Sequence, residues 1–266
     1  MRILFLAVDD EFAGEMQRYL YESHPDWVVG SVLATQAIYK HSPAQAGLMV
    51  LKKSGPRYLL EMAKMKILRR LVASDDDSAV TPEALAERHN VPIHRSANIN
   101  NEESLQWLRA LEPDLIISTN FSHYVSKKAR DVAATGAWNL HKSYLPQNRG
   151  MAPSFYALLN DDPYAGVTLH VLEKGFDTGA IVDQRKVDIS HGDTVYDLNQ
   201  RSSRVGGEML AGLLDNKPLD QIEATEQPSG EWPDHTYPSP ADIRRFLKAG
   251  HAFDKWSFGD LRGLIG

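Results

Sequence analysis

The 266-residue sequence contains no cysteine, which excludes disulfide bonds, thiolate metal ligands and thiol nucleophiles. It also lacks any run that approaches the roughly 20 apolar residues of a membrane-spanning helix. The apolar start, residues 1–8, is shorter than the hydrophobic core of a signal peptide and leads directly into acidic residues. We therefore expect a cytoplasmic protein without a membrane partner, and the absence of cysteine fits a reducing compartment.

Basic residues are also comparatively few. The 29 Lys and Arg are outnumbered by 35 Asp and Glu, which gives a net charge of −6 and a pI near 5.9. A broad nucleic-acid-binding surface is basic because it has to neutralise phosphates, so we expect no nucleic-acid partner. The remaining composition, 42% hydrophobic and 24% charged, is that of a globular protein with a sizeable core.

Short apolar runs alternate with helical patterns along the chain. Residues 2–8, 27–33 and 114–118 are nearly continuous apolar runs, which are typical of strands buried in a parallel sheet. Residues 10–21 and 129–134 have the composition and spacing of helices. This alternation predicts an α/β fold with a doubly wound, mostly parallel sheet.

The composition changes after Pro218, where proline and glycine become frequent. We expect one main domain over residues 1–220 and a C-terminal helical and irregular extension over residues 221–266. This Pro-rich tail is predicted to contain a helix near residues 241–248. It would pack on the main domain or at a dimer interface, and a homodimer is left open.

One segment departs from the acidic composition. Between residues 52 and 70 a single acid, Glu61, is accompanied by seven basic residues, Lys52, Lys53, Arg57, Lys64, Lys66, Arg69 and Arg70. Apolar residues interleave at helical spacing, so the segment is predicted to be an amphipathic helix with its apolar face on the core. Two other interpretations stay open. The segment could dock an anionic group such as a nucleotide diphosphate or a carrier phosphopantetheine, or it could contact a membrane surface.

The most informative polar stretch is GAWNLHKSYLPQNRG, residues 136–150. Asn139 and His141 lie two residues apart near the end of a predicted strand, so their side chains share one face of the sheet. Pro146 cannot continue a central strand because it has no amide donor. The pair is therefore placed where a strand becomes a loop, and α/β sheets bind ligands at that edge. Asp177 supplies a carboxylate further along the chain.

An amide, an imidazole and a carboxylate together suit the attack of an amine on an acyl group. The amide N–H can stabilise a developing oxyanion. The neutral imidazole can take up a proton near pH 7, and a carboxylate can fix its tautomer. No hydroxyl or thiol with a nucleophile motif is present. We therefore expect direct transfer between two bound substrates through a tetrahedral intermediate, and not an acyl-enzyme.

The sequence resembles the 10-formyltetrahydrofolate-dependent formyltransferases. Three motifs carry the resemblance: NLH at residues 139–141, HKSYLPQNRG at residues 141–150 and GFDTG at residues 175–179. The similar region covers roughly residues 113–189. The resemblance implies a Rossmann-like formyltransferase fold over the main domain. In architecture the chain is most similar to the nucleotide-sugar N-formyltransferases, and it is related to methionyl-tRNA formyltransferase without the C-terminal tRNA domain of that enzyme.

The resemblance also implies roles for individual residues. Asn139 would polarise the formyl carbonyl, His141 would belong to the proton-transfer network, and Asp177 would orient His141 and order a water molecule. The folate cosubstrate would lie between two loops and contact Phe121, His123, Tyr124, Val125, Leu172, Glu173 and Gly175.

The predicted substrate contacts are Ser143, Pro146 and Arg149. Ser143 and Pro146 also fit a purely loop-shaping role, and Arg149 fits an ion pair with a local carboxylate equally well. His170 is expected to be a structural histidine on a strand. We expect no metal site.

The implied activity is N-formyl transfer from 10-formyltetrahydrofolate to a primary amine. The predicted acceptor is a small anionic molecule, namely an amino sugar linked to a nucleotide. A tRNA acceptor is disfavoured because the C-terminal tail is Pro-rich and not basic. Two alternatives are a methionyl-tRNA formyltransferase-like enzyme and a non-catalytic relative that binds folate or nucleotide. The sequence does not identify the amine.

Overall fold

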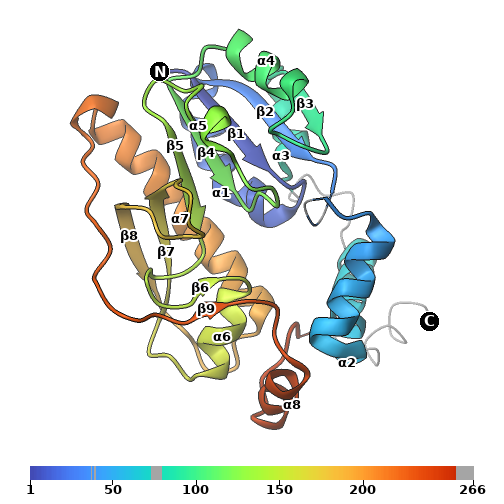
Figure 1. Ribbon diagram of the computed structural model, residues 1–266. Coiled ribbons are helices and arrows are strands. Elements are labelled where there is room, and N and C mark those ends of the chain that lie inside the picture. The colour runs from blue at the N-terminus through green and yellow to red at the C-terminus, as the bar shows by residue number, and fades with distance from the viewer. Residues whose placement is uncertain (37, 39, 73–79, 256–266) are drawn as a thin grey trace.

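A seven-stranded sheet forms the centre of the protein (Figure 1). The computed structural model describes residues 1–36, 38, 40–72 and 80–255, and it describes only the backbone of residues 66 and 68–72. The strand order is β3-β2-β1-β4-β5-β7-β8. The first five strands are parallel, whereas β7 and β8 are antiparallel to their neighbours. The predicted α/β fold with a doubly wound, mostly parallel sheet is confirmed.

The strands of this sheet are short and have similar lengths. They are β1 (Ile3–Ala7), β2 (Val28–Ala34), β3 (Ile93–Ser96), β4 (Leu115–Thr119), β5 (Ala137–His141), β7 (Ala165–Val171) and β8 (Ile181–Val187). A second sheet pairs two very short strands, β6 (Arg149–Gly150) and β9 (Asp234–His235).

Helices begin where capping chemistry predicts. The Asp10 side chain accepts the amide of Ala13 at 2.8 Å at the start of α1, and Thr81 accepts the amide of Ala84 at 3.3 Å at the start of α3. The helices are α1 (Glu11–Ser23), α2 (Pro43–Val72), α3 (Pro82–Arg88), α4 (Glu102–Ala110), α5 (Lys127–Arg130), α6 (Pro153–Leu159), α7 (Val195–Asn216) and α8 (Pro240–Lys248), with 3₁₀ turns η1 (Pro25–Trp27) and η2 (Leu219–Gln221).

Successive residues of the central strand β1 face opposite helical layers. Ile3 and Phe5 lie in a buried cluster with residues of α1, α3 and α7, whereas Leu4 and Leu6 lie in another cluster with residues of α4 and α5. Because both faces of the strand are covered, every position needs an apolar side chain. This is the physical reason for the continuous apolar run at the start of the sequence.

The helix predicted over residues 129–134 is wrong in its extent, because α5 (Lys127–Arg130) ends earlier. The amide of Ala134 donates to the carbonyl of Pro113 at 3.1 Å and draws the chain back toward the sheet. Gly136 then adopts a φ of 98°, which only glycine adopts without strain, and turns the chain into β5.

The described part of the tail packs on the main domain. β9 pairs with β6, the short strand at the end of the predicted active-site stretch. In α8, Ile243 and Phe246 are buried in a cluster with Phe155 of α6, and the rings of Phe155 and Phe246 lie 4.5 Å apart. The boundary at residue 220 and the homodimer stay predictions.

The helix α2 lies to one side of the sheet, next to α8 (Figure 1). Gly55, with a φ of 79° and a ψ of 173°, is not helical, so α2 consists of two helical segments that meet at this residue, and Pro56 follows it. Tyr58, Met62 and Met65 pack against the buried cluster that contains α6 and α8. The segment after Gly55 therefore has one face on the core, as predicted, whereas the predicted helix is interrupted at Gly55.

Candidate active site

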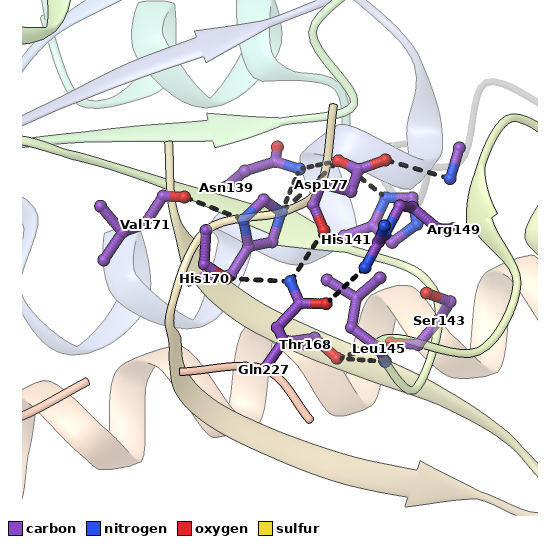
Figure 2. Close-up of polar contacts among 12 residues, drawn as sticks. Asn139, His141, Ser143, Leu145, Arg149, Thr168, His170, Val171, Asp177 and Gln227 are labelled. Atoms are coloured by element: carbon purple, nitrogen blue, oxygen red, sulfur yellow. Dashed lines mark hydrogen bonds and ion pairs between the residues drawn. The ribbon is translucent and has the colours of Figure 1, made fainter. Parts of the chain in front are cut away.

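Asn139 and His141 share one face of β5, near the point where the strand ends (Figure 2). The antiparallel neighbour β7 places His170 opposite Asn139 and Thr168 opposite His141. Directly opposed residues of paired strands lie on the same face. Four polar side chains therefore gather at this edge of the sheet.

Asp177 joins these side chains from the loop between β7 and β8 (Figure 2). Its Oδ1 lies 3.7 Å from Nδ1 of His141 and 3.5 Å from Nε2 of His170. Its Oδ2 accepts the backbone amide of Gly150 at 3.2 Å, and Nδ2 of Asn139 lies 3.5 Å from Oδ1. The three residues predicted as the catalytic set thus meet in one place.

Burial and charge set the protonation of this cluster. Burial raises the pKa of Asp177, but His141, His170 and the amide of Gly150 outweigh burial and lower this pKa to about 2. The carboxylate is therefore charged at neutral pH. Burial lowers the pKa of His141, against the opposing effect of Asp177, so the His141 imidazole is neutral at pH 7.

The two ring nitrogens of His141 have different surroundings. Nδ1 faces Asp177, and a carboxylate favours the tautomer in which the nearer nitrogen carries the proton. Nε2 is buried and has no hydrogen-bond partner among the described residues. A buried, unpartnered polar atom costs about 1–3 kcal/mol, and this cost is typical of groups kept for function. Nε2 of His141 is thus able to accept a proton.

His170 belongs to the same cluster, although it was expected to be a structural histidine. Its Nδ1 lies 3.0 Å from the carbonyl of Val171, as expected for a histidine with satisfied polar groups. Its Nε2, however, lies 3.2 Å from Nδ2 of Asn139 as well as near Asp177. The alternation of side chains along β7 predicts from the sequence that His170 shares a face with Thr168. The register that places His170 opposite Asn139 is set by the pairing of β5 and β7, and no local sequence pattern indicates it.

The loop after β5 is held in place by polar side chains from β7 and β8. The Thr168 hydroxyl accepts the amide of Leu145 at 3.0 Å and donates to the carbonyl of Ser143 at 2.7 Å. The Gln184 amide donates to the carbonyl of Leu145 at 2.8 Å and to the Thr168 hydroxyl at 3.0 Å. Ser143 and Pro146, both predicted substrate contacts, are buried in this loop.

Gln227, from the tail, stabilises the loop that carries Asp177, and no sequence motif predicted this role. Its side-chain amide donates to the carbonyls of Asp177 at 2.8 Å and Gly179 at 2.9 Å. Its Oε1 accepts from the Arg149 guanidinium at 3.1 Å, and Arg149 also lies 3.7 Å from a carboxylate oxygen of Asp234. Arg149 therefore has a local carboxylate beside it, as the ion-pair interpretation of this residue expected. Its contact with substrate stays a prediction.

The two loops predicted to hold folate lie side by side. Phe121 and Val125, from the loop after β4, pack in one apolar cluster with Leu172, which follows β7. The amide of Leu172 donates to the carbonyl of Ala137 at 2.8 Å, at the start of β5. These contacts place both loops next to the strand that carries Asn139.

The other predicted folate contacts differ in exposure. His123 is buried, its ring lies 4.8 Å from that of Phe121, and burial lowers its pKa to about 4. Tyr124, Glu173 and Gly175 are exposed. Their binding to folate stays a prediction.

A partly buried lysine that no sequence motif predicted lies beside the cluster. Lys142 follows His141 directly, and its Nζ lies 4.6 Å from the centroid of the Phe12 ring. Burial lowers the pKa of Lys142, against the opposing charges of Asp10 and Glu11. Burial in turn raises the pKa of Asp10. Asp10, Glu11 and Phe12 follow β1, and Lys142 follows β5, so all four lie at the carboxyl edge of the sheet. This common position could have identified them from the sequence.

Comparison with known proteins identifies the family. The family model described as formyl transferase matches residues 18–214, and the chain therefore belongs to the formyl transferase family. Methionyl-tRNA formyltransferases of Trichlorobacter lovleyi and Thermotoga maritima are 32% and 33% identical to it over 138 and 150 residues. These regions are 52% and 56% of this chain but 44% and 48% of the relatives. The chain thus matches about half the length of these relatives.

Solved structures share the fold at low sequence identity. An N-formyltransferase from Helicobacter canadensis, described in complex with folinic acid and dTDP-3-aminofucose, has a TM-score of 0.54 and 18% identity over 89% of this chain and 72% of that chain. Glycinamide ribonucleotide transformylase 1 from Symbiobacterium toebii has a TM-score of 0.57 and 16% identity over 86% of this chain and 94% of that chain. The formyltransferase resemblance inferred from the motifs is confirmed.

Proposed function

We propose that this protein transfers a formyl group from 10-formyltetrahydrofolate to the primary amine of a small anionic molecule, an amino sugar linked to a nucleotide. The observation that carries the proposal is the convergence of Asn139, His141 and Asp177, with Nε2 of His141 buried and without a hydrogen-bond partner among the described residues. A charged carboxylate behind a neutral imidazole is the arrangement that general-base chemistry needs.

His141 moves the proton in this reaction. As the amine nitrogen bonds to the formyl carbon, Nε2 of His141 takes the proton that the amine loses. The charged Asp177 beside Nδ1 stabilises the imidazolium that forms. The bond between the formyl carbon and the folate nitrogen then breaks, and that nitrogen receives the proton. Formyl, proton and electron pair are all accounted for without an acyl-enzyme.

Asn139 stabilises the negative charge that develops on the formyl oxygen. Its Nδ2 has two hydrogens and lies 3.2 Å from His170 and 3.5 Å from Asp177. The second contact is long for an N–H···O hydrogen bond, so a formyl oxygen can replace it. A single oxyanion donor of this kind is worth about 10²–10³ in turnover.

Apolar surface next to the site supports the binding of a ring-containing ligand. Tyr124, Met151 and Phe176 have exposed fractions of 39%, 43% and 77%, and apart from side chains on α2 they are the exposed large hydrophobic residues of the described chain. Phe176 precedes Asp177, Met151 follows Gly150, and Tyr124 lies on the first predicted folate loop. An apolar surface gathered around polar groups is typical of a ligand site.

The comparisons support two acceptor classes. The Helicobacter canadensis enzyme, which shares the fold, is described with an amino sugar linked to a nucleotide, and this favours the proposed acceptor. The curated relatives are methionyl-tRNA formyltransferases, which makes a methionyl-tRNA the second candidate.

The test is formyl transfer by the full-length protein. The protein is mixed with 10-formyltetrahydrofolate and either nucleotide-linked amino sugars or methionyl-tRNA. Release of tetrahydrofolate and the mass gain of the acceptor are then measured. We expect transfer to an amino sugar, and we expect His141→Ala and Asn139→Ala each to lower turnover by about 10²–10³. The exposed His191 provides a matched control, His191→Ala, with unchanged turnover.

Three results would count against parts of the proposal. Near-normal turnover in both His141→Ala and Asn139→Ala would contradict the catalytic roles assigned to these residues. Transfer to methionyl-tRNA alone would contradict the amino-sugar acceptor and identify methionyl-tRNA as the acceptor instead. Folate binding without transfer to any amine would favour the non-catalytic alternative.

A further inference from the structure

The helix α2 carries most of the exposed apolar side chains of the described chain. Eight large hydrophobic residues are exposed, and five of them lie on this helix. Single exposed apolar residues are ordinary on a protein surface, whereas a gathered set marks an interaction surface. The five are Leu48, Leu51, Leu59, Leu60 and Ile67, with exposed fractions of 51%, 39%, 37%, 47% and 52%.

The same helix concentrates positive charge. Residues 43–72 contain seven of the 29 basic residues and one of the 35 acidic residues, so this segment carries +6 and the rest of the chain carries −12. Lys52, Lys53 and Arg57 are exposed. The side chains of three further basic residues lie outside the described part of the chain, namely Lys66, Arg69 and Arg70.

Glu61, the single acid of α2, is buried and therefore does not offset the positive charge on the outer surface of the helix. Glu61 is only 5% exposed and lies 2.9 Å from Nη2 of Arg57 and 2.5 Å from Nζ of Lys64. Tyr58 and Met62, on the same inner side, pack against the core. The outer surface of α2 therefore presents leucine, isoleucine and basic side chains without an exposed carboxylate of its own.

We propose that this outer surface of α2, made of the five exposed apolar residues together with the exposed Lys52, Lys53 and Arg57, binds the surface of an anionic lipid bilayer. Basic side chains are attracted to anionic headgroups, and adjacent apolar side chains enter the boundary with the acyl chains. No helix of the described residues is long and apolar enough to cross a membrane, so the contact is peripheral.

Charge favours a bilayer over a second copy of the chain on this surface. Two α2 helices brought face to face would place two segments of +6 against each other, and like charges repel. A bilayer also needs no groove with a matching shape. The proposal departs from the expectation that the protein has no membrane partner, and it selects the membrane-surface interpretation that was left open for the basic segment.

The test is sedimentation of the full-length protein with lipid vesicles. One set contains phosphatidylcholine alone, and the other contains equal parts of phosphatidylcholine and phosphatidylglycerol. We expect binding to the anionic vesicles only, and we expect this binding to weaken as salt is added, because salt screens the attraction.

Substitutions on α2 separate its two contributions. Lys52→Glu with Lys53→Glu should weaken vesicle binding at least about 30-fold, since each basic residue near an anionic surface contributes about fivefold. Leu60→Ser with Ile67→Ser should weaken it about tenfold through lost apolar burial. The matched control is Arg204→Glu with Lys217→Glu, which makes the same charge change at exposed positions in α7 and at its C-cap and should leave binding unchanged.

All six substituted positions are exposed and lie outside the proposed catalytic set, so circular dichroism and formyl transfer to a soluble amine should be unchanged. This keeps the result separate from the proposed function. Absence of binding to anionic vesicles, or an equal loss in the control variant, would overturn the proposal. A dimer seen by light scattering without lipid and lost in Leu60→Ser with Ile67→Ser would also overturn it and assign the surface to a second copy.

Discussion

The side-chain amide of Gln227 donates a hydrogen bond to the backbone carbonyl of Asp177 at 2.8 Å, across 50 residues of sequence (Figure 2). Asp177 has a φ of 52°, in the left-handed region that most non-glycine residues avoid. The bond therefore holds an unfavourable backbone conformation that aims the carboxylate at His141. The C-terminal tail is in this way part of the structure that positions the proposed catalytic carboxylate.

Removing the Gln227 side chain should reduce both turnover and stability. We expect Gln227→Ala to lower kcat about tenfold, because the Asp177 carboxylate loses its fixed position behind His141. The unfolding free energy should also fall, by about 2–4 kcal/mol, because Gln227 makes three hydrogen bonds. Steady-state kinetics and urea unfolding measure the two effects. The exposed Gln221 provides the control, Gln221→Ala, and an unchanged kcat in Gln227→Ala would contradict the positioning role.

The Asp177 carboxylate should stabilise the fold only above strongly acidic pH. Its pKa is about 2 in the folded protein, below the ordinary value of 3.8, so the folded state binds this proton less readily than the unfolded state. Its contribution, about 2 kcal/mol, is complete above pH 3.8 and is lost as the pH falls toward 2. Urea unfolding of the wild type and Asp177→Asn should give a stability difference that shrinks over this range. A constant difference would show that the carboxylate charge is not the source.

The pH dependence of turnover should report the proposed base. Burial lowers the pKa of His141 below its ordinary value of 6.5, so the imidazole is neutral and able to accept a proton at pH 7. The acid limb of the kcat profile should therefore lie below pH 6.5. His141→Asn should lose this limb while any limb due to the acceptor amine remains. An acid limb that persists in His141→Asn would assign it to another group.

The loop after β5 should depend on the hydroxyl of Thr168. Thr168→Val keeps the side-chain shape but leaves the buried amide of Leu145 and carbonyl of Ser143 without this partner. We expect a loss of about 2–4 kcal/mol in unfolding free energy and a lower turnover. Thr168→Ser keeps the hydroxyl and should lose much less. Equal losses in the two variants would show that the methyl group and its packing matter as much as the hydrogen bonds, which would contradict the prediction.

Local sequence patterns were sufficient for much of the fold. The apolar run of β1 predicted a strand covered on both faces, and the pattern of residues 10–21 predicted the helix α1. These features depend on a few neighbouring residues, so they can be seen without the tertiary structure. The helix predicted over residues 129–134 was wrong because distant backbone hydrogen bonds, such as that from Ala134 to Pro113, draw the chain into the sheet.

The sequence by itself determined that Asn139 and His141 share a face, because a side-chain period of two belongs to a single strand. The motif around Asp177 predicted the third member of the set. Only the tertiary structure decided that His170 lies close to both Asn139 and Asp177, and that Gln227 holds the Asp177 loop. Strand register and contacts across 50 residues arise from the packing of the whole chain, and no local spacing of residue types encodes them.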